Sequence, residues 1–178
     1  YNIETKYLVP ALKSPREINE IFVKKEKLEY KVLFIKDNKS KLKNTNVLKY
    51  IEKAESESIH ETETFRTRKI WFQLPALKYA PLLWVDLRGD KHICHFNTDK
   101  VPFEHNFYGL KPLNEYLDIA YCSFLNTSLC WLFIEIIGRT GLGGGAIRLV
   151  GKDLDLFPII DFKGIKRSII QKLEESFD

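Results

Sequence analysis

The chain has 178 residues, 44% of them apolar and 13% aromatic, which is enough to bury a core as one domain or as one domain with a helical appendage. Charged residues make up 29%, a proportion that argues against a disordered chain. The longest apolar run, near 130–137, is far shorter than the roughly 20 residues of a membrane helix. Because the three cysteines show no paired spacing and no signal peptide is visible, we expect a protein of the reducing cytoplasm without membrane contact.

Residues 1–110 alternate strand-like segments with turns. Lys31–Lys36 predicts a strand, and Asn46 predicts the N-cap of a helix that runs to about Ser56. Four further segments have strand-like composition, namely Lys69–Leu74, Leu82–Leu87, His92–Asn97 and Lys100–Phe107. We therefore expect a mixed, strand-rich module over residues 1–110.

Residues 111–178 have a more helical pattern. A helix is predicted over about Pro112–Phe124, and Asn126–Ser128 predicts the cap of a second helix, Leu129–Ile137, which Gly138 ends. The glycine-rich loop 141–145 follows, and the remaining predicted elements are the strand Ala146–Val150, the extended segment Leu156–Ile160 and the closing helix Ile165–Phe177. The expected fold class is α+β, as one compact unit with a strand-rich module, a helical segment and a C-terminal helix.

The sequence begins at Tyr1 and contains no methionine. We therefore expect it to be a part of a longer protein.

Positive charge is unevenly distributed. Residues 24–53 hold ten lysines against four acidic residues, Arg66, Arg68 and Lys69 form a short basic cluster, and 139–152 contains basic residues and no acid. Segregated cationic patches of this kind attract a phosphate backbone, although a lysine-rich face can also serve only solubility. Charge alone leaves both interpretations open.

Several motifs resemble catalytic or cofactor sites but lack the required context. The loop 141–145 follows a predicted helix and precedes a strand, the reverse of a nucleotide-phosphate loop, so we expect no cofactor there. His92 and Cys94 have no second ligand cluster, so no metal site is expected, and all three cysteines are expected to be buried core residues. Acidic residues near Glu29 and Asp37 lack the partners that a nuclease needs.

Seven short motifs occur in an order that resembles one group of DNA methyltransferases. Tyr7–Glu17 is similar to a "P-x-L-K-S-P-R-E" segment, and Arg68–Leu74 is similar to "R-x-x-W-[YF]-x-L". The other matching segments are Leu48–Glu52, Phe107–Pro112, Phe124–Leu129, Glu135–Gly145 and Leu154–Asp161. Together they resemble the C-terminal target-recognition domain of N6-adenine DNA methyltransferases of the restriction–modification type, in the type IIG-like (Eco57I-like) group.

The resemblance implies a mixed α/β module that reads double-stranded DNA beside an N-terminal catalytic domain. That catalytic domain uses an Asn-Pro-Pro-Tyr-type loop for the flipped adenine and binds S-adenosylmethionine, whereas this chain has no Pro-Pro pair. We therefore expect no catalytic residue and no cofactor within the chain, and S-adenosylmethionine in the parent enzyme. Two alternatives remain open: a DNA-specificity subunit of a type I restriction system, and a protein-interaction module that does not bind DNA.

The candidate DNA-binding residues combine the resemblance with the basic clusters. Arginine is favoured for base edges because it can bond to guanine through two nitrogens, whereas the lysines of 24–53 suit phosphates. Trp71 is expected to be structural, on a strand. The candidates are Lys13, Ser14, Arg16, Arg66, Arg68, Lys69, Arg139, Thr140 and Arg148, with Arg88 and His92 as weaker candidates for base contacts.

Overall fold

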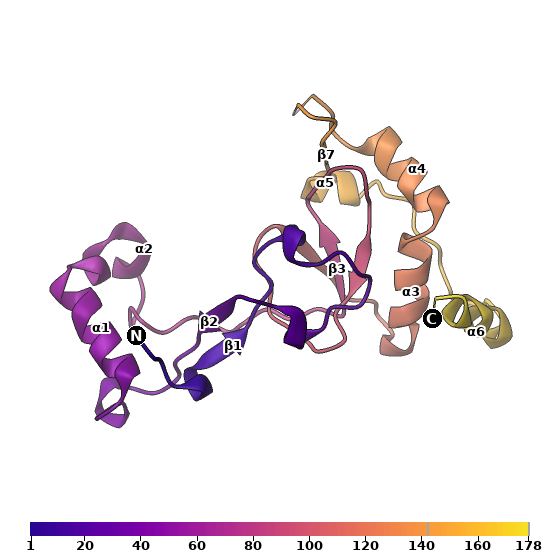
Figure 1. Ribbon diagram of the computed structural model, residues 1–178. Helices are drawn as coiled ribbons and strands as arrows, with labels where there is room; N and C mark the ends of the chain where they lie inside the picture. Colours follow the sequence, from indigo (N-terminus) through magenta and orange to yellow (C-terminus); the bar gives the residue numbers. More distant parts are fainter. Residues whose placement is uncertain (142, 178) are drawn as a thin grey trace. The chain divides into compact units, whose positions relative to one another are not determined.

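The structure is a computed structural model that describes residues 1–141 and 143–177 (Figure 1). It divides into two compact units, each assembled from two separate stretches of sequence. Unit 1 comprises residues 1–11 and 28–78, and unit 2 comprises residues 12–27 and 79–178. The division therefore follows boundaries other than the expected one near residue 110. Helices and small antiparallel sheets together give the α+β class that the sequence predicts.

Unit 1 combines a two-stranded sheet with helices. Strands β1 (Leu8–Pro10) and β2 (Lys31–Leu33) pair antiparallel, with Val9 opposite Val32. Helix α1 (Asn46–Ser56) is followed by the single turn α2 (Glu63–Arg66). Helix α1 and the segments that flank the two strands form one core, whose buried members are Tyr7, Ile35, Leu42, Val47 and Ile51.

The N-terminus of α1 lies one residue earlier than expected. The cap is Thr45, whose hydroxyl accepts a hydrogen bond from the Leu48 amide at 3.2 Å, so Asn46 is the first helical residue instead. The carboxylate of Glu4 accepts bonds from the next two amides, Asn46 at 2.6 Å and Val47 at 3.2 Å. These bonds, the one from Asn46 foremost, lower the pKa of Glu4. A carboxylate distant in sequence thus completes the cap.

The expected strand Lys69–Leu74 is wrong. Its backbone forms turns, with the Gln73 amide bonded to the Ile70 carbonyl at 3.1 Å. Trp71 is partly buried against the core of unit 1, and its indole Nε1 donates to Glu55 Oε1 at 2.9 Å. Trp71 is therefore structural, as expected, but it is held by side-chain packing and not by a strand ladder.

Unit 2 is built around a three-stranded antiparallel sheet in the order β5-β3-β6, with β3 (Leu82–Val85) in the centre. Its neighbours are β5 (Cys94–Phe96) and β6 (Phe107–Leu110). The expected strand Lys100–Phe107 is wrong over most of its length. Asn97 holds residues 97–101 in a turn by accepting from the Val101 amide and donating to the Val101 carbonyl, both at 2.9 Å.

A second small sheet pairs β4 (Leu87–Arg88) with β7 (Ile147–Arg148). The helices of unit 2 are α3 (Asp118–Leu125), α4 (Ser128–Ile137), α5 (Gly151–Leu154) and α6 (Arg167–Glu175). Helix α3 lies beside α6 (Figure 1), and Thr127 caps α4, as the sequence predicts.

The main core of unit 2 joins the central sheet to α3, α4 and the segment after β7. It contains Trp84, Leu125, Ile134, Leu149 and Phe157 among others. The three cysteines, Cys94, Cys122 and Cys130, are buried and not disulfide-bonded, which confirms their expected place in the core.

Within the described residues, no single helix has both the length and the apolar composition needed to cross a membrane. By those two measures alone, one pair bent by 71° does, Glu115–Leu125 with Ser128–Ile137.

Candidate nucleic-acid interface

A cleft of about 630 Å³ lies entirely within unit 2. One wall comes from residues 14–19 and the other from the segment 85–95, and Asn106 and Ala146 complete the lining. Three of the candidate residues predicted from the sequence, Ser14, Arg16 and Arg88, line it together. Pairs of segments distant in the chain thus meet at one concave surface, which is where binding sites are usually found.

The first wall is rigidly shaped by its own hydrogen bonds. Ser14 and Glu17 form a reciprocal cap: the Ser14 amide donates to Glu17 Oε1 at 2.7 Å, and the Ser14 hydroxyl accepts from the Arg16 amide at 3.3 Å. Asn106 donates to the Lys13 carbonyl at 3.1 Å and also lines the cleft. The turn therefore holds Arg16 exposed beside the cleft.

The second wall contains a buried cation. Arg88 is only 3% exposed, its Nε donates to the Val85 carbonyl at 2.8 Å, and its guanidinium carbon lies 4.6 Å from the ring centre of Trp84. Within the described chain, Nη1 and Nη2 have no hydrogen-bond partner. Burial lowers the pKa of Arg88 to about 9, so the side chain is still charged at neutral pH.

His95 is the second buried titratable group of the cleft. It is 3% exposed, and its Nδ1 lies 2.8 Å from the Glu20 carbonyl. Burial lowers the pKa of His95, so the ring is neutral at pH 7 and Nδ1 carries the proton that the carbonyl accepts.

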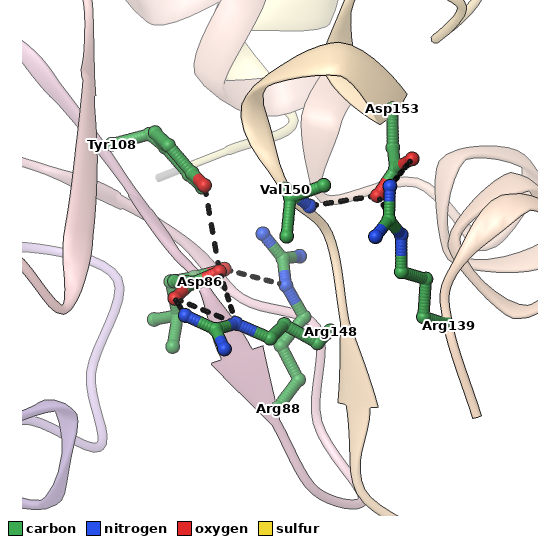
Figure 2. Close-up of polar contacts among 8 residues, drawn as sticks. Asp86, Arg88, Tyr108, Arg139, Arg148, Val150 and Asp153 are labelled. Atoms are coloured by element: carbon green, nitrogen blue, oxygen red, sulfur yellow. Dashed lines mark hydrogen bonds and ion pairs between the residues drawn. The ribbon is translucent and has the colours of Figure 1, made fainter. Parts of the chain in front are cut away.

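A second group of polar residues surrounds the hairpin that follows α4 (Figure 2). Arg139 and Arg148 exchange both backbone bonds across this hairpin, at 2.9 and 3.0 Å. The guanidinium of Arg139 binds both carboxylate oxygens of Asp153, at 3.0 and 3.1 Å. The guanidinium of Arg148 lies 2.9 Å from Asp86, which Tyr108 also approaches at 3.5 Å.

These ion pairs shift the ionisation of their members. The bond to Asp86 raises the pKa of Arg148. The Val150 amide, followed by the guanidinium of Arg139, lowers the pKa of Asp153. Both arginines remain about half exposed, at 57% and 50% of their side chains, while the two aspartates are 14% exposed. Each arginine is thus oriented by an aspartate, Asp153 or Asp86, that lies outside the acid-free segment 139–152 of the sequence.

The other candidates fall into two groups. Arg66, Arg68 and Lys69 belong to unit 1, where Arg66 and Lys69 are exposed and Arg68 donates to the Trp71 carbonyl at 3.4 Å. Lys13 and Thr140 are exposed parts of unit 2.

His92 occupies an unexpected environment. It is 3% exposed, lies against Trp131, and its Nε2 is 2.6 Å from Glu135 Oε1. In this conformation the buried ring of His92 is not accessible to a DNA base. The terminal nitrogens of Arg88 are also buried and therefore not accessible to a base. Their roles as base-reading residues remain predictions that need a rearrangement of these side chains.

Five polar residues of the cleft are not among the candidates predicted from the sequence, namely Asn19, Asp90, Lys91, His95 and Asn106. Lys91 directly follows the Gly89-Asp90 turn after Arg88. Its closeness in sequence to the candidate Arg88 could have identified it as a candidate too. Nothing local singles out the two asparagines. Among the described residues, no group of three or more His, Cys, Asp or Glu side chains is placed to hold a metal ion.

Fold and site define an α+β domain with a cation-lined cleft and an arginine-flanked hairpin. The chain belongs to the family described as the C-terminal domain of the type II methyltransferase M.Eco57I, whose model matches residues 12–178. No curated protein matches the sequence.

A solved structure, that of the type IIG restriction endonuclease BpuSI, has a similar fold, with a TM-score of 0.67 and 15% identity. The similarity covers 98% of this chain and 21% of the BpuSI chain, so the chain spans about a fifth of that protein's length.

Proposed function

We propose that this chain is the sequence-specific DNA-recognition domain of an adenine-specific methyltransferase of a restriction–modification system. It positions duplex DNA for N6-adenine methylation by a catalytic domain outside the chain. S-adenosylmethionine is bound by that catalytic domain. The chain itself binds the duplex and recognises its sequence.

Family membership supports a role next to methyl transfer. An enzyme that modifies a base within a duplex must take the base out of the stack, and this requires a surface that holds the flanking DNA. A C-terminal domain of a type II methyltransferase is suited to supply that surface.

The observation that carries the proposal is the convergence of cations on one cleft. Arg16 comes from the first stretch of unit 2, whereas Arg88 and Lys91 come from the second, and all three line the same cleft. Asp90 is the only acid lining it among the described residues. A concave surface with excess positive charge concentrates the field that attracts phosphates.

The proposal is tested by fluorescence anisotropy of the full-length protein with labelled duplex DNA over a range of salt concentrations. We expect log Kd to depend linearly on log salt, with a slope of about 0.9 for each neutralised phosphate. The double variant Arg16→Met/Lys91→Met should bind more weakly and show a smaller slope.

Lys163→Met is the matched control, since Lys163 is an exposed lysine of unit 2 that does not line the cleft. Absence of duplex binding at low salt would contradict the proposal. Salt-insensitive association with a protein in its place would favour the interaction-module alternative.

A further inference from the structure

Arg88 is an energetic anomaly in unit 2. The residue is 3% exposed, yet of its guanidinium nitrogens only Nε is hydrogen-bonded within the described chain. A buried polar group without a partner is costly, and more so when it is charged. The carboxylate of Asp86, two residues before Arg88, is already bound by Arg148. Within the described residues, this charge in the cleft wall contacts the Trp84 ring and the Val85 carbonyl and forms no ion pair with a carboxylate.

The surroundings of this charge fit an anionic ligand with an apolar frame. Arg16 and Lys91 add two exposed cations, and Ser14 and Asn106 add polar groups. Apolar side chains such as Ile18 and Ile93 complete the lining. A phosphodiester has this mixed character, because its charged oxygens are flanked by the apolar faces of two sugars.

We propose that the cleft of unit 2 receives one backbone phosphate of the DNA, with Arg88 as the buried countercharge and Arg16 and Lys91 as cations at the entrance. This inference rests on the proposed DNA-binding function. Both terminal nitrogens of Arg88 are buried. Arg88 therefore attracts the phosphate through its charge first, and a direct hydrogen bond forms when its side chain turns toward the cleft.

Such a contact positions the DNA without reading its sequence. The role differs from the base-edge contact that the sequence alone favours for Arg88. Loss of a phosphate contact lowers the affinity for all duplexes by the same factor. Loss of a base contact instead reduces the discrimination between duplexes of different sequence.

The test uses the full-length protein, a duplex that it selects from a random library, and an unrelated duplex. Arg88→Met removes the charge at similar volume, and Arg88→Lys retains it. For Arg88→Met we expect Kd to rise about tenfold on both duplexes. The salt slope should fall by about 0.9. Arg88→Lys should keep the wild-type slope.

Thermal unfolding of the same variants separates this role from a structural one. Since Arg88 is a buried charge without an ion-pair partner among the described residues, we expect Arg88→Met to unfold at a temperature no lower than wild type. Lower stability with unchanged DNA binding would mean that Arg88 serves the fold, and would overturn the inference. So would a loss confined to the selected duplex, which would indicate base reading.

A second measurement does not depend on the folding of Arg88→Met. Single uncharged methylphosphonates are placed in turn along the selected duplex. We expect one position at which the substitution weakens wild-type binding and has less effect on Arg16→Met/Lys91→Met. Absence of such a position would overturn the inference. If the wild-type protein binds neither duplex, the proposed function itself fails, which is a distinct outcome.

Discussion

At the scale of single residues, arginines that are candidates for DNA contact are held by acids of the same unit. Arg139 and Arg148 each bind an aspartate that is 14% exposed (Figure 2). Exposed ion pairs contribute little stability, commonly less than about 1 kcal/mol, so their main effect here is on orientation. A DNA phosphate that binds either guanidinium competes with the aspartate for it.

This competition makes two substitutions informative in the full-length enzyme. Under the proposed function, Arg139→Ala should lower methylation while S-adenosylmethionine binding is retained, because the contact that it removes is one to DNA. Asp153→Asn frees the guanidinium and keeps an acceptor for the Val150 amide, so DNA affinity should be maintained or increased. Anisotropy and methyl-transfer assays measure both effects.

Arg167→Ala is the matched control, since Arg167 forms a comparable half-exposed pair with Glu174 at 3.1 Å on α6. If Asp153→Asn weakened DNA binding as much as Arg139→Ala, the arginine would act only by holding the hairpin.

His95 makes the stability of unit 2 depend on pH. Burial, with a smaller contribution from Arg88, places its pKa below the usual 6.5. The unfolded chain therefore binds more protons as pH falls below about 6.5, so stability declines from that pH downward until the folded state is also protonated. Urea unfolding at pH 7.5 and 5.5 should show this loss, and His95→Gln should reduce it. An equal loss in the variant would assign the pH dependence to other groups.

At the scale of elements, the passage from α4 into the hairpin requires a residue without a side chain. A Cβ on Gly138 would lie 2.2 Å from Ile147 Cγ2 and 2.6 Å from the Ile134 carbonyl oxygen. The helix end and β7 are therefore packed in direct contact. The φ of Gly138 is −66°, so close approach and not backbone conformation selects glycine here.

Gly138→Ala should destabilise unit 2 by about 1–3 kcal/mol because the backbone oxygen cannot move aside cheaply. Gly89→Ala is the control, since no atom of the described residues lies within 4 Å of its added Cβ, and its cost should stay below about 0.5 kcal/mol. Chemical denaturation of both variants measures the difference. Equal stability of the two would mean that the hairpin can shift away from α4.

At the scale of the whole molecule, the proposed function places DNA reading in this chain and methyl transfer in a catalytic domain outside it. The chain spans 21% of the BpuSI chain, and its sequence lacks a Pro-Pro pair. Incubated alone with duplex DNA and labelled S-adenosylmethionine, the chain should transfer no methyl group, whereas the full-length protein should label adenine. Label transferred by the chain alone would contradict the proposal that the catalytic domain lies outside this chain.

The sequence by itself determined the features that depend on neighbouring residues. Thr127 lies at the start of an apolar helical stripe and caps α4, the cysteines lie within apolar patterns and are buried, and the order of short motifs points to the family that the comparison shows. Helix caps and hydrophobic periodicity act within a few residues, so they can be read along the chain.

The tertiary structure alone decided which polar groups have partners and which residues share a surface. His92 meets Glu135 across 43 positions and Arg148 meets Asp86 across 62, while Trp71 is held by Glu55 in place of a strand. Arg16 and Arg88 line one cleft, and Arg88 is buried with two nitrogens that have no partner among the described residues. Such contacts join segments far apart in sequence, and no local pattern encodes which segments become neighbours when the core forms.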